Sequence, residues 1–166
     1  MLSKLTVLVI ILLTYGYLLY PKLTFPKPPP DSSQSAEDAD SESFYRRAYF
    51  TNYSREEVVA HYESQFNYLP ILKLNYPPED AQTLIRDQAR SSYLEELVHP
   101  LRESIYINGF SPKTAKDEIW HRGIKYKHKI TIKYVPGNVI PAFLVVTAAG
   151  MLAYWLIKEI EITLKE

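Results

Sequence analysis

The sequence predicts an α+β fold, in which one small domain is flanked by an N-terminal and a C-terminal transmembrane helix. Two long runs carry no charged residue, at positions 5–20 and 139–157. Between them, a helix-start signal at Ser54 stands among segments with the alternating pattern of strands. The length of 166 residues fits a single folded domain between the two runs.

The first apolar run predicts an N-terminal membrane anchor over residues 1–20. Its sixteen uncharged residues, 5–20, would form a helix of about 24 Å, slightly shorter than a hydrocarbon core of roughly 30 Å. A secretory signal peptide is the competing interpretation, because Lys4 precedes the run. No small-x-small cleavage pattern follows, so we expect an uncleaved signal anchor.

The second apolar run predicts a transmembrane helix over residues 136–158, followed by a short charged tail, 159–166. Its nineteen uncharged residues, 139–157, reach about 28 Å as a helix. Tyr154 and Trp155 stand at the far end, where amphipathic rings favour the headgroup level. A buried core helix is the alternative, but a chain of this size has little interior to surround one.

The lysines that flank the two runs give conflicting signals for orientation. Six flank them on the domain side and three on the other side: Lys22, Lys27, Lys125, Lys127, Lys129 and Lys133 against Lys4, Lys158 and Lys165. That excess favours a cytoplasmic domain, but the rule weakens for segments longer than about 60 residues. The N-terminal anchor pattern favours export, and we therefore expect an extracytoplasmic domain.

Residues 21–43 have the composition of a spacer. They are rich in proline, serine and acidic residues, with five carboxylates and no cation between residues 28 and 45: Asp31, Glu37, Asp38, Asp40 and Glu42. Such a segment has too few apolar side chains to fold alone. The folded domain is therefore expected over residues 44–135.

The first half of that domain predicts a strand, a helix and a further short strand. Residues 44–51 are aromatic and strand-like. Ser54 and Glu57 have the spacing of a capping box, and apolar residues follow at helical spacing, so residues 55–67 are predicted to be a helix. The apolar piece 69–76 is compatible with a second strand.

The second half predicts another helix and an antiparallel strand pair. Prolines and acidic residues at the start of the 77–98 segment are typical of a helix N-terminus, and Pro100 stops it. A strand is predicted over 102–110, a loop over 111–118 and a last strand over 120–135, in which Gly123 is a natural point of interruption. The predicted order is strand, helix, optional strand, helix, strand, strand.

Lysines define one face of the last predicted strand. Alternation with apolar residues places four of them on a common face: Lys125, Lys127, Lys129 and Lys133. A solvated face that deters edge-to-edge pairing is one interpretation. The others are contact with an anionic membrane leaflet, and contact with the acidic spacer of the same or another chain.

A polar cluster in the second predicted helix is a further candidate interaction surface. Arg86, Asp87 and Arg90 lie between apolar ends of the helix. Two arginines four residues apart repel each other unless an anionic group lies near them. A solvated helix face and a buried network that fastens the helix to the sheet are the alternatives.

The sequence contains no recognisable catalytic or metal-binding motif. There is no cysteine, which excludes disulfides and thiolate chemistry. Glu57 and His61 share a helix face, but two ligands do not make a metal site. No nucleophile elbow or phosphate-cradling glycine loop occurs, and Tyr126 and Tyr134 point away from the lysines, which disfavours nucleic acid. We therefore expect no metal, no cofactor and no nucleic acid.

These features predict a two-span membrane protein that presents its domain at the membrane surface. It would act as a non-enzymatic scaffold or accessory subunit of an envelope assembly, with membrane lipids and other membrane-protein subunits or a second copy as partners. A lipid- or polymer-binding module is the first alternative. The second is a membrane-bound hydrolase or transferase that uses Arg86, Asp87, Arg90 and His99.

Overall fold

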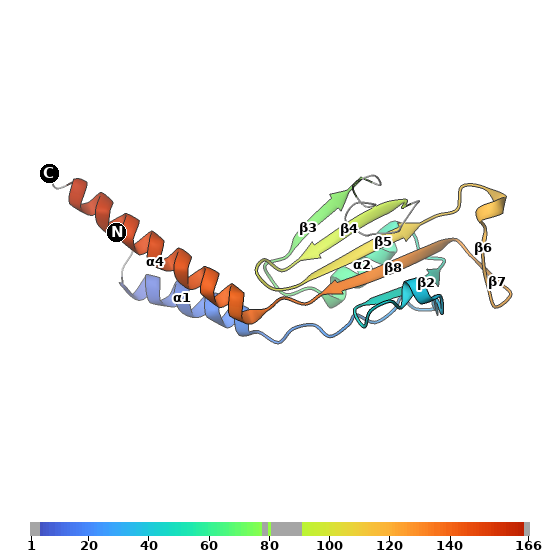
Figure 1. Cartoon of the computed structure of the whole chain (residues 1–166), viewed down its shortest axis with the longest axis horizontal. Helices are drawn as coiled ribbons and strands as arrows, with labels where there is room; N and C mark the ends of the chain where they lie inside the picture. Colours follow the sequence, from blue (N-terminus) through green and yellow to red (C-terminus); the bar gives the residue numbers. More distant parts are fainter. Residues whose placement is uncertain (1–3, 78–79, 81–90, 165–166) are drawn as a thin grey trace. The chain divides into compact units, whose positions relative to one another are not determined.

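A computed structural model of the chain describes residues 4–77, 80 and 91–164 (Figure 1). The chain divides into two compact units. Residues 22–136 form a sheet domain, and residues 1–21 with 137–166 form a helical unit. The predicted α+β class with an antiparallel sheet is confirmed.

The sheet domain is built on a six-stranded antiparallel sheet with the order β1-β2-β8-β5-β4-β3. A separate hairpin pairs the two short strands β6 and β7. The strands are β1 (Ser33–Gln34), β2 (Arg46–Thr51), β3 (Leu72–Tyr76), β4 (Tyr93–Val98), β5 (Ser104–Phe110), β6 (Ile119–His121), β7 (Ile124–Tyr126) and β8 (His128–Val135). Two short 3-10 turns, η1 (Asp38–Asp40) and η2 (Ala115–Asp117), complete the domain.

Helix α2 (Arg55–Gln65) covers one face of this sheet. Its predicted capping box is present, because the Glu57 amide donates to Ser54 Oγ and the Ser54 amide donates to Glu57 Oε2. The buried core between helix and sheet consists of Tyr49, Val58, Tyr62, Phe66, Tyr93, Leu97, Ile105, Ile107, Ile130, Ile132 and Tyr134. The predicted first strand, first helix and second strand are thus confirmed.

The second predicted helix was wrong at its C-terminal end, where residues 93–98 form β4. This strand pairs with β3 on one side and β5 on the other. Leu97 joins the core under α2, whereas Leu94 packs on the opposite face against Tyr76 and Tyr106. Because both faces of β4 are buried, its apolar residues do not alternate, and their three-residue spacing imitates a helix.

The last predicted strand, over 120–135, is interrupted at the predicted point, Gly123, and a second time at Lys127. The chain reverses at Arg122 and Gly123, which both have positive φ values, 51° and 77°. Two such residues are typical of the tight turn that joins two hairpin strands. The chain bends again at Lys127, between β7 and β8, so the segment forms three strands.

The acidic segment before β2 folds onto the sheet domain as a strap, defined here as residues 31–43. Strand β1 pairs with β2, and the Ser35 amide donates to the Ala48 carbonyl at 2.9 Å. Lys129 Nζ lies 2.8 Å from Glu37 Oε2 and 2.7 Å from Asp40 Oδ2. Of the three interpretations of the lysine face, contact with the acidic segment of the same chain therefore holds for Lys129.

Removing the Lys129 ammonium should destabilise the protein, because the Asp40 side chain is only 4% exposed. We expect Lys129→Ala to lower the free energy of unfolding by about 2 kcal/mol, since it leaves a buried carboxylate without its cation. Lys125→Ala is the matched control, because the pair of Lys125 with Glu118 is more exposed; it should cost less than about 1 kcal/mol. Urea unfolding in detergent measures both, and equal losses would contradict the role of the strap.

The helical unit contains α1 (Lys4–Leu19) and α4 (Val139–Thr163). Within α4, residues Val139–Ile160 are long and apolar enough to cross a membrane. The apolar stretch of α1, Leu5–Leu19, is shorter, so a single candidate span is found among the described residues. This finding supports membrane association weakly, and it does not show the orientation.

Candidate functional site

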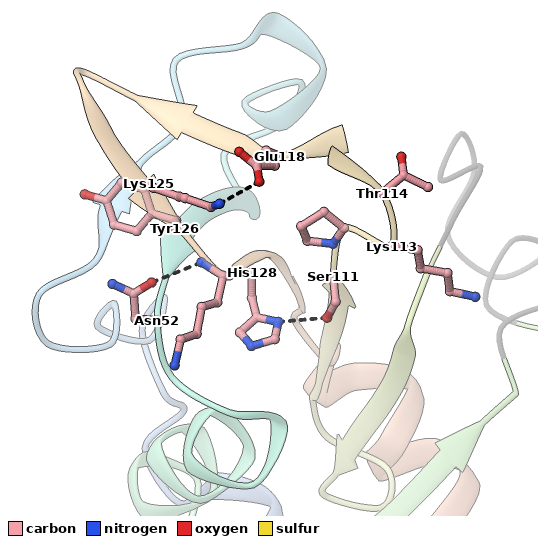
Figure 2. Close-up of a pocket in the computed structure, with 10 residues that line it drawn as sticks. Asn52, Ser111, Lys113, Thr114, Glu118, Lys125, Tyr126 and His128 are labelled. Atoms are coloured by element: carbon pink, nitrogen blue, oxygen red, sulfur yellow. Dashed lines mark hydrogen bonds and ion pairs between the residues drawn. The ribbon is translucent and has the colours of Figure 1, made fainter. Parts of the chain in front are cut away.

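An open pocket of about 840 Å³ lies between the β6–β7 hairpin and the ends of β5 and β8 (Figure 2). Its lining comes from the chain after β2, the loop after β5, and the region around the β7–β8 bend. The lining residues are Asn52, Ser111, Pro112, Lys113, Thr114, Glu118, Lys125, Tyr126, Lys127 and His128.

Apolar packing fixes the hairpin that forms one wall of the pocket. Phe50, Ile119 and Tyr126 are buried together, and Phe110 packs against them. These side chains fasten β6 and β7 to the sheet, on the face opposite α2, because Phe50 alternates with the core residue Tyr49 along β2. The hairpin therefore has a fixed place over the sheet.

Two hydrogen bonds hold the remaining walls. Asn52 Oδ1 accepts from the Lys127 amide at 3.0 Å, which stabilises the bend between β7 and β8. The Ser111 amide donates to Ser92 Oγ at 2.7 Å, which fixes the chain just after β5. The following residue, Pro112, has no amide proton to continue the strand pairing.

Two polar pairs face each other across the pocket (Figure 2). On one side, Ser111 Oγ lies 2.7 Å from His128 Nδ1. Burial lowers the pKa of His128 and the neighbouring Lys127 lowers it further, so the imidazole is neutral at pH 7. On the other side, Lys125 Nζ donates to Glu118 Oε1 at 2.6 Å, and the Trp120 indole donates to Glu118 Oε2 at 3.2 Å.

The pocket carries an excess of positive charge. Three lysines line it against a single glutamate. Glu118 balances Lys125, which leaves Lys113 and Lys127 with no ion-pair partner in the part of the chain that the structure describes. Two ammonium groups are thus available to an anion.

The four lysines of the predicted face do not lie on one strand. Lys125 lies on β7 and Lys127 at the bend, and both line the pocket. Lys129, on β8, binds the strap, while Lys133 is exposed near the other end of β8. Their role as an interaction surface stays a prediction.

The second predicted surface, Arg86, Asp87 and Arg90, lies outside the described residues. The other residue of the hydrolase alternative, His99, is 1% exposed. Its ring nitrogens lie 2.8 Å from the Pro70 carbonyl and 3.1 Å from the Phe66 carbonyl, and burial lowers its pKa. The imidazole of His99 therefore belongs to the core and not to the pocket.

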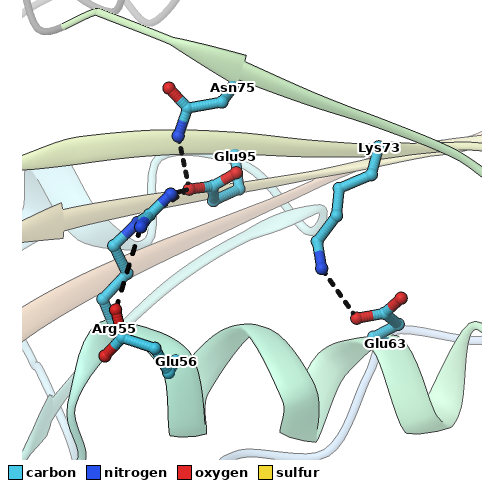
Figure 3. Close-up of polar contacts among 6 residues, drawn as sticks. All are labelled: Arg55, Glu56, Glu63, Lys73, Asn75 and Glu95. Carbon is cyan, nitrogen blue, oxygen red and sulfur yellow. Dashed lines mark hydrogen bonds and ion pairs between the residues drawn. The ribbon is translucent and has the colours of Figure 1, made fainter.

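A second polar cluster fastens α2 to the sheet (Figure 3). Glu95, on β4, has a side chain that is 3% exposed; it accepts from Arg55 Nε at 2.8 Å and from Asn75 Nδ2 at 2.7 Å. A second ion pair joins Lys73 to Glu63 at 2.9 Å. The cluster connects the first turn of α2 with β3 and β4, which is a structural role.

The adjacent carboxylate, Glu96, points to the opposite face of β4. There it accepts from the Tyr76 hydroxyl at 2.6 Å, which raises the pKa of Tyr76 to about 12. Glu95 and Glu96 therefore cannot act on one substrate atom, for the reason that successive side chains of a strand point to opposite faces.

Within the described ranges, no group of three or more histidine, aspartate or glutamate side chains could hold a metal ion. The candidate ligand His61 instead places Nε2 3.0 Å from the Lys27 carbonyl and 2.9 Å from Gln65 Nε2. Its neighbour Glu57 is engaged in the capping box.

Comparisons of the chain with protein-family models, with curated proteins and with solved structures found no match. The function is therefore argued from the geometry of the two units and of the pocket.

Proposed function

We propose that the chain is a membrane-anchored protein whose sheet domain acts by contact, as a non-enzymatic scaffold or accessory subunit of a membrane assembly. The observation that carries the proposal is the apolar surface of α4. Only 6% of its most apolar window is buried, and Leu144, Met151 and Leu152 are each about two thirds exposed. A helix of 22 such residues matches the thickness of a hydrocarbon core and would aggregate in water.

The proposal includes α1 as a second span. Sixteen residues reach about 24 Å, which a bilayer can accommodate by local thinning. The Tyr15 hydroxyl lies 2.8 Å from Thr147 Oγ1, and the Tyr15 ring stacks on Phe143 at 4.3 Å. Polar groups that satisfy each other between two helices are typical of helices packed within a membrane. With two spans, both termini lie on one side and the sheet domain on the other.

The buried polar groups favour a contact role over catalysis. Glu95 is held by Arg55 and Asn75, and Glu103 is held by Arg102 and the Tyr68 hydroxyl. Both carboxylates are buried and hydrogen-bonded to these neighbours, and neither lines the pocket. Ser111 and His128 do form a nucleophile–base pair, but the described residues place no carboxylate on His128 to orient it, as hydrolytic triads require.

Orientation is tested by trypsin added to intact cells. Lys113 and Lys116, in the loop after β5, and Arg122, in the hairpin turn, are exposed cleavage sites. An exported domain should be cut at these positions without lysis. Full protection until the cells are lysed would contradict an extracytoplasmic domain and place it in the cytoplasm.

A further inference from the structure

We propose that the lysine-lined pocket binds a phosphate group of a soluble ligand. Its volume of about 840 Å³ leaves room for more than the phosphate itself. The inference goes beyond the scaffold role, because it assigns a ligand chemistry to the domain. It rests on the charge, the donor types and the position of the pocket.

The donor types favour phosphate over carboxylate. The lining contains lysines and the Ser111 hydroxyl but no arginine, while the Thr114 hydroxyl donates to Asp117 Oδ2. Ammonium groups act as point charges and suit the several oxygens of a phosphate, whereas planar carboxylates are matched by the arginine fork. Lys113 and Lys127, which have no ion-pair partner among the described residues, would neutralise the phosphate charge.

The Ser111–His128 pair adds a donor when it takes up a proton. With neutral His128, the Ser111 hydroxyl donates to Nδ1. With protonated His128, Nδ1–H donates to Ser111 Oγ, and the hydroxyl is then free to donate to the phosphate. The charged groups that share the pocket with His128 are Lys113, Lys125, Lys127 and Glu118. Because burial lowers the pKa of His128, phosphate affinity should increase only as the pH falls below the ordinary pKa of histidine.

Within the sheet domain, the pocket lies far from the point at which the chain leaves towards α4, which favours a soluble source of the phosphate. His128 begins β8 and Val135 ends it, so the two lie about 23 Å apart along the strand. The chain leaves the domain towards α4 just after Val135, and Val135 pairs with Ser104 at the same end of the sheet. The pocket thus lies at the end of the domain remote from that connection.

Trp120 provides a probe of the pocket. The chain has two tryptophans, so Trp155→Phe leaves Trp120 as the single one. Trp120 donates to Glu118, and Lys125 Nζ lies 6.0 Å from its ring centre. An anion that attracts Lys125 will change the environment of the indole and its fluorescence.

The test is a titration of this full-length variant, in nanodiscs of zwitterionic lipid, with pyrophosphate at constant ionic strength. We expect a saturable fluorescence change whose affinity falls at least about tenfold with Lys113→Gln and Lys127→Gln combined. The matched control removes two charges far from the pocket, Lys27→Gln and Lys73→Gln, and should bind as the parent does. Acidification should tighten binding by the parent, and His128→Gln should abolish that pH dependence.

Three outcomes would overturn the proposal. The first is no saturable response, and the second is an equal loss in the control variant. The third concerns the source of the phosphate: if nanodiscs of anionic phospholipid abolish the pyrophosphate response, lipid headgroups occupy the pocket and a soluble ligand is refuted. A response that is unchanged in anionic nanodiscs supports the soluble source.

Discussion

Replacing Glu103 by leucine should lower the free energy of unfolding by about 3–5 kcal/mol, since it breaks a fully buried ion pair from one side. Arg102 donates to both carboxylate oxygens, from Nη2 at 3.1 Å and from Nε at 3.2 Å. The two side chains are 1% and 0% exposed. Arginine cannot lose its charge in a protein, so the variant buries a guanidinium that has lost both of these acceptors.

The matched control is Glu63→Leu, which breaks the ion pair with Lys73 on the surface. These side chains are 42% and 47% exposed, so the loss should stay below about 1 kcal/mol. Urea unfolding of both variants in the same detergent gives the comparison. A loss for Glu103→Leu no larger than that for Glu63→Leu would show that the buried pair does not stabilise the domain.

The same substitution should remove a pH dependence of stability. Burial raises the pKa of Glu103 to about 7, although Lys22 lowers it in part. Between the ordinary pKa near 4.5 and about 7, the folded protein therefore holds a proton that the unfolded chain has released. The stability that comes from this proton is full below pH 4.5 and is lost as the pH rises through about 7, above which only the ion pair with Arg102 remains. Glu103→Leu should lack this decline.

Replacing Gly109 by alanine should destabilise the protein by about 2 kcal/mol through overpacking. Gly109 lies directly opposite Tyr93 in the β4–β5 pair. A Cβ at Gly109 would overlap the Tyr93 ring, which is 8% exposed and belongs to the core under α2. The ring would have to leave its site, and Arg55, whose guanidinium lies 5.8 Å from the ring centre, would be displaced with it.

A double-variant cycle separates overpacking from an intrinsic preference for glycine. With Tyr93→Leu in the background, the overlap is absent, and Gly109→Ala should cost much less than in the wild type. Thermal or urea unfolding of the four proteins measures the coupling. If the two losses simply add, the close approach of Tyr93 is not the reason for glycine at this position.

Local signals were enough to predict α2 and the first strand. Ser54 and Glu57 specify the helix start within four residues, and the apolar side chains that follow belong to one face. Strand β4 could not be recognised in this way, because burial of Leu94 and Leu97 on opposite faces removes the alternation that marks a strand. Only the pairing with β3 and β5 distinguishes it from a helix.

The pocket could be predicted only in part. Lys125 and Lys127 stood out by their spacing, but the bend at Lys127 separates them from β8, the strand that carries Lys129 and Lys133. Ser111 and His128 are 17 residues apart and carry no motif, so only the pairing of β5 with β8 reveals that they meet. The ion pair between Lys129 and Asp40 also carries no sequence motif. It forms because the strap folds back onto the sheet.

The central claim is that α4 lies in hydrocarbon, and the lack of native cysteine allows a direct test. Met151→Cys places one thiol near the middle of Val139–Ile160, and Lys113→Cys places one in the exposed loop of the sheet domain. In isolated, opened membranes, a water-soluble maleimide should label Lys113→Cys readily and leave Met151→Cys unlabelled until detergent unfolds the protein. Labelling of Met151→Cys at the rate of Lys113→Cys in those membranes would place α4 in water and contradict the claim.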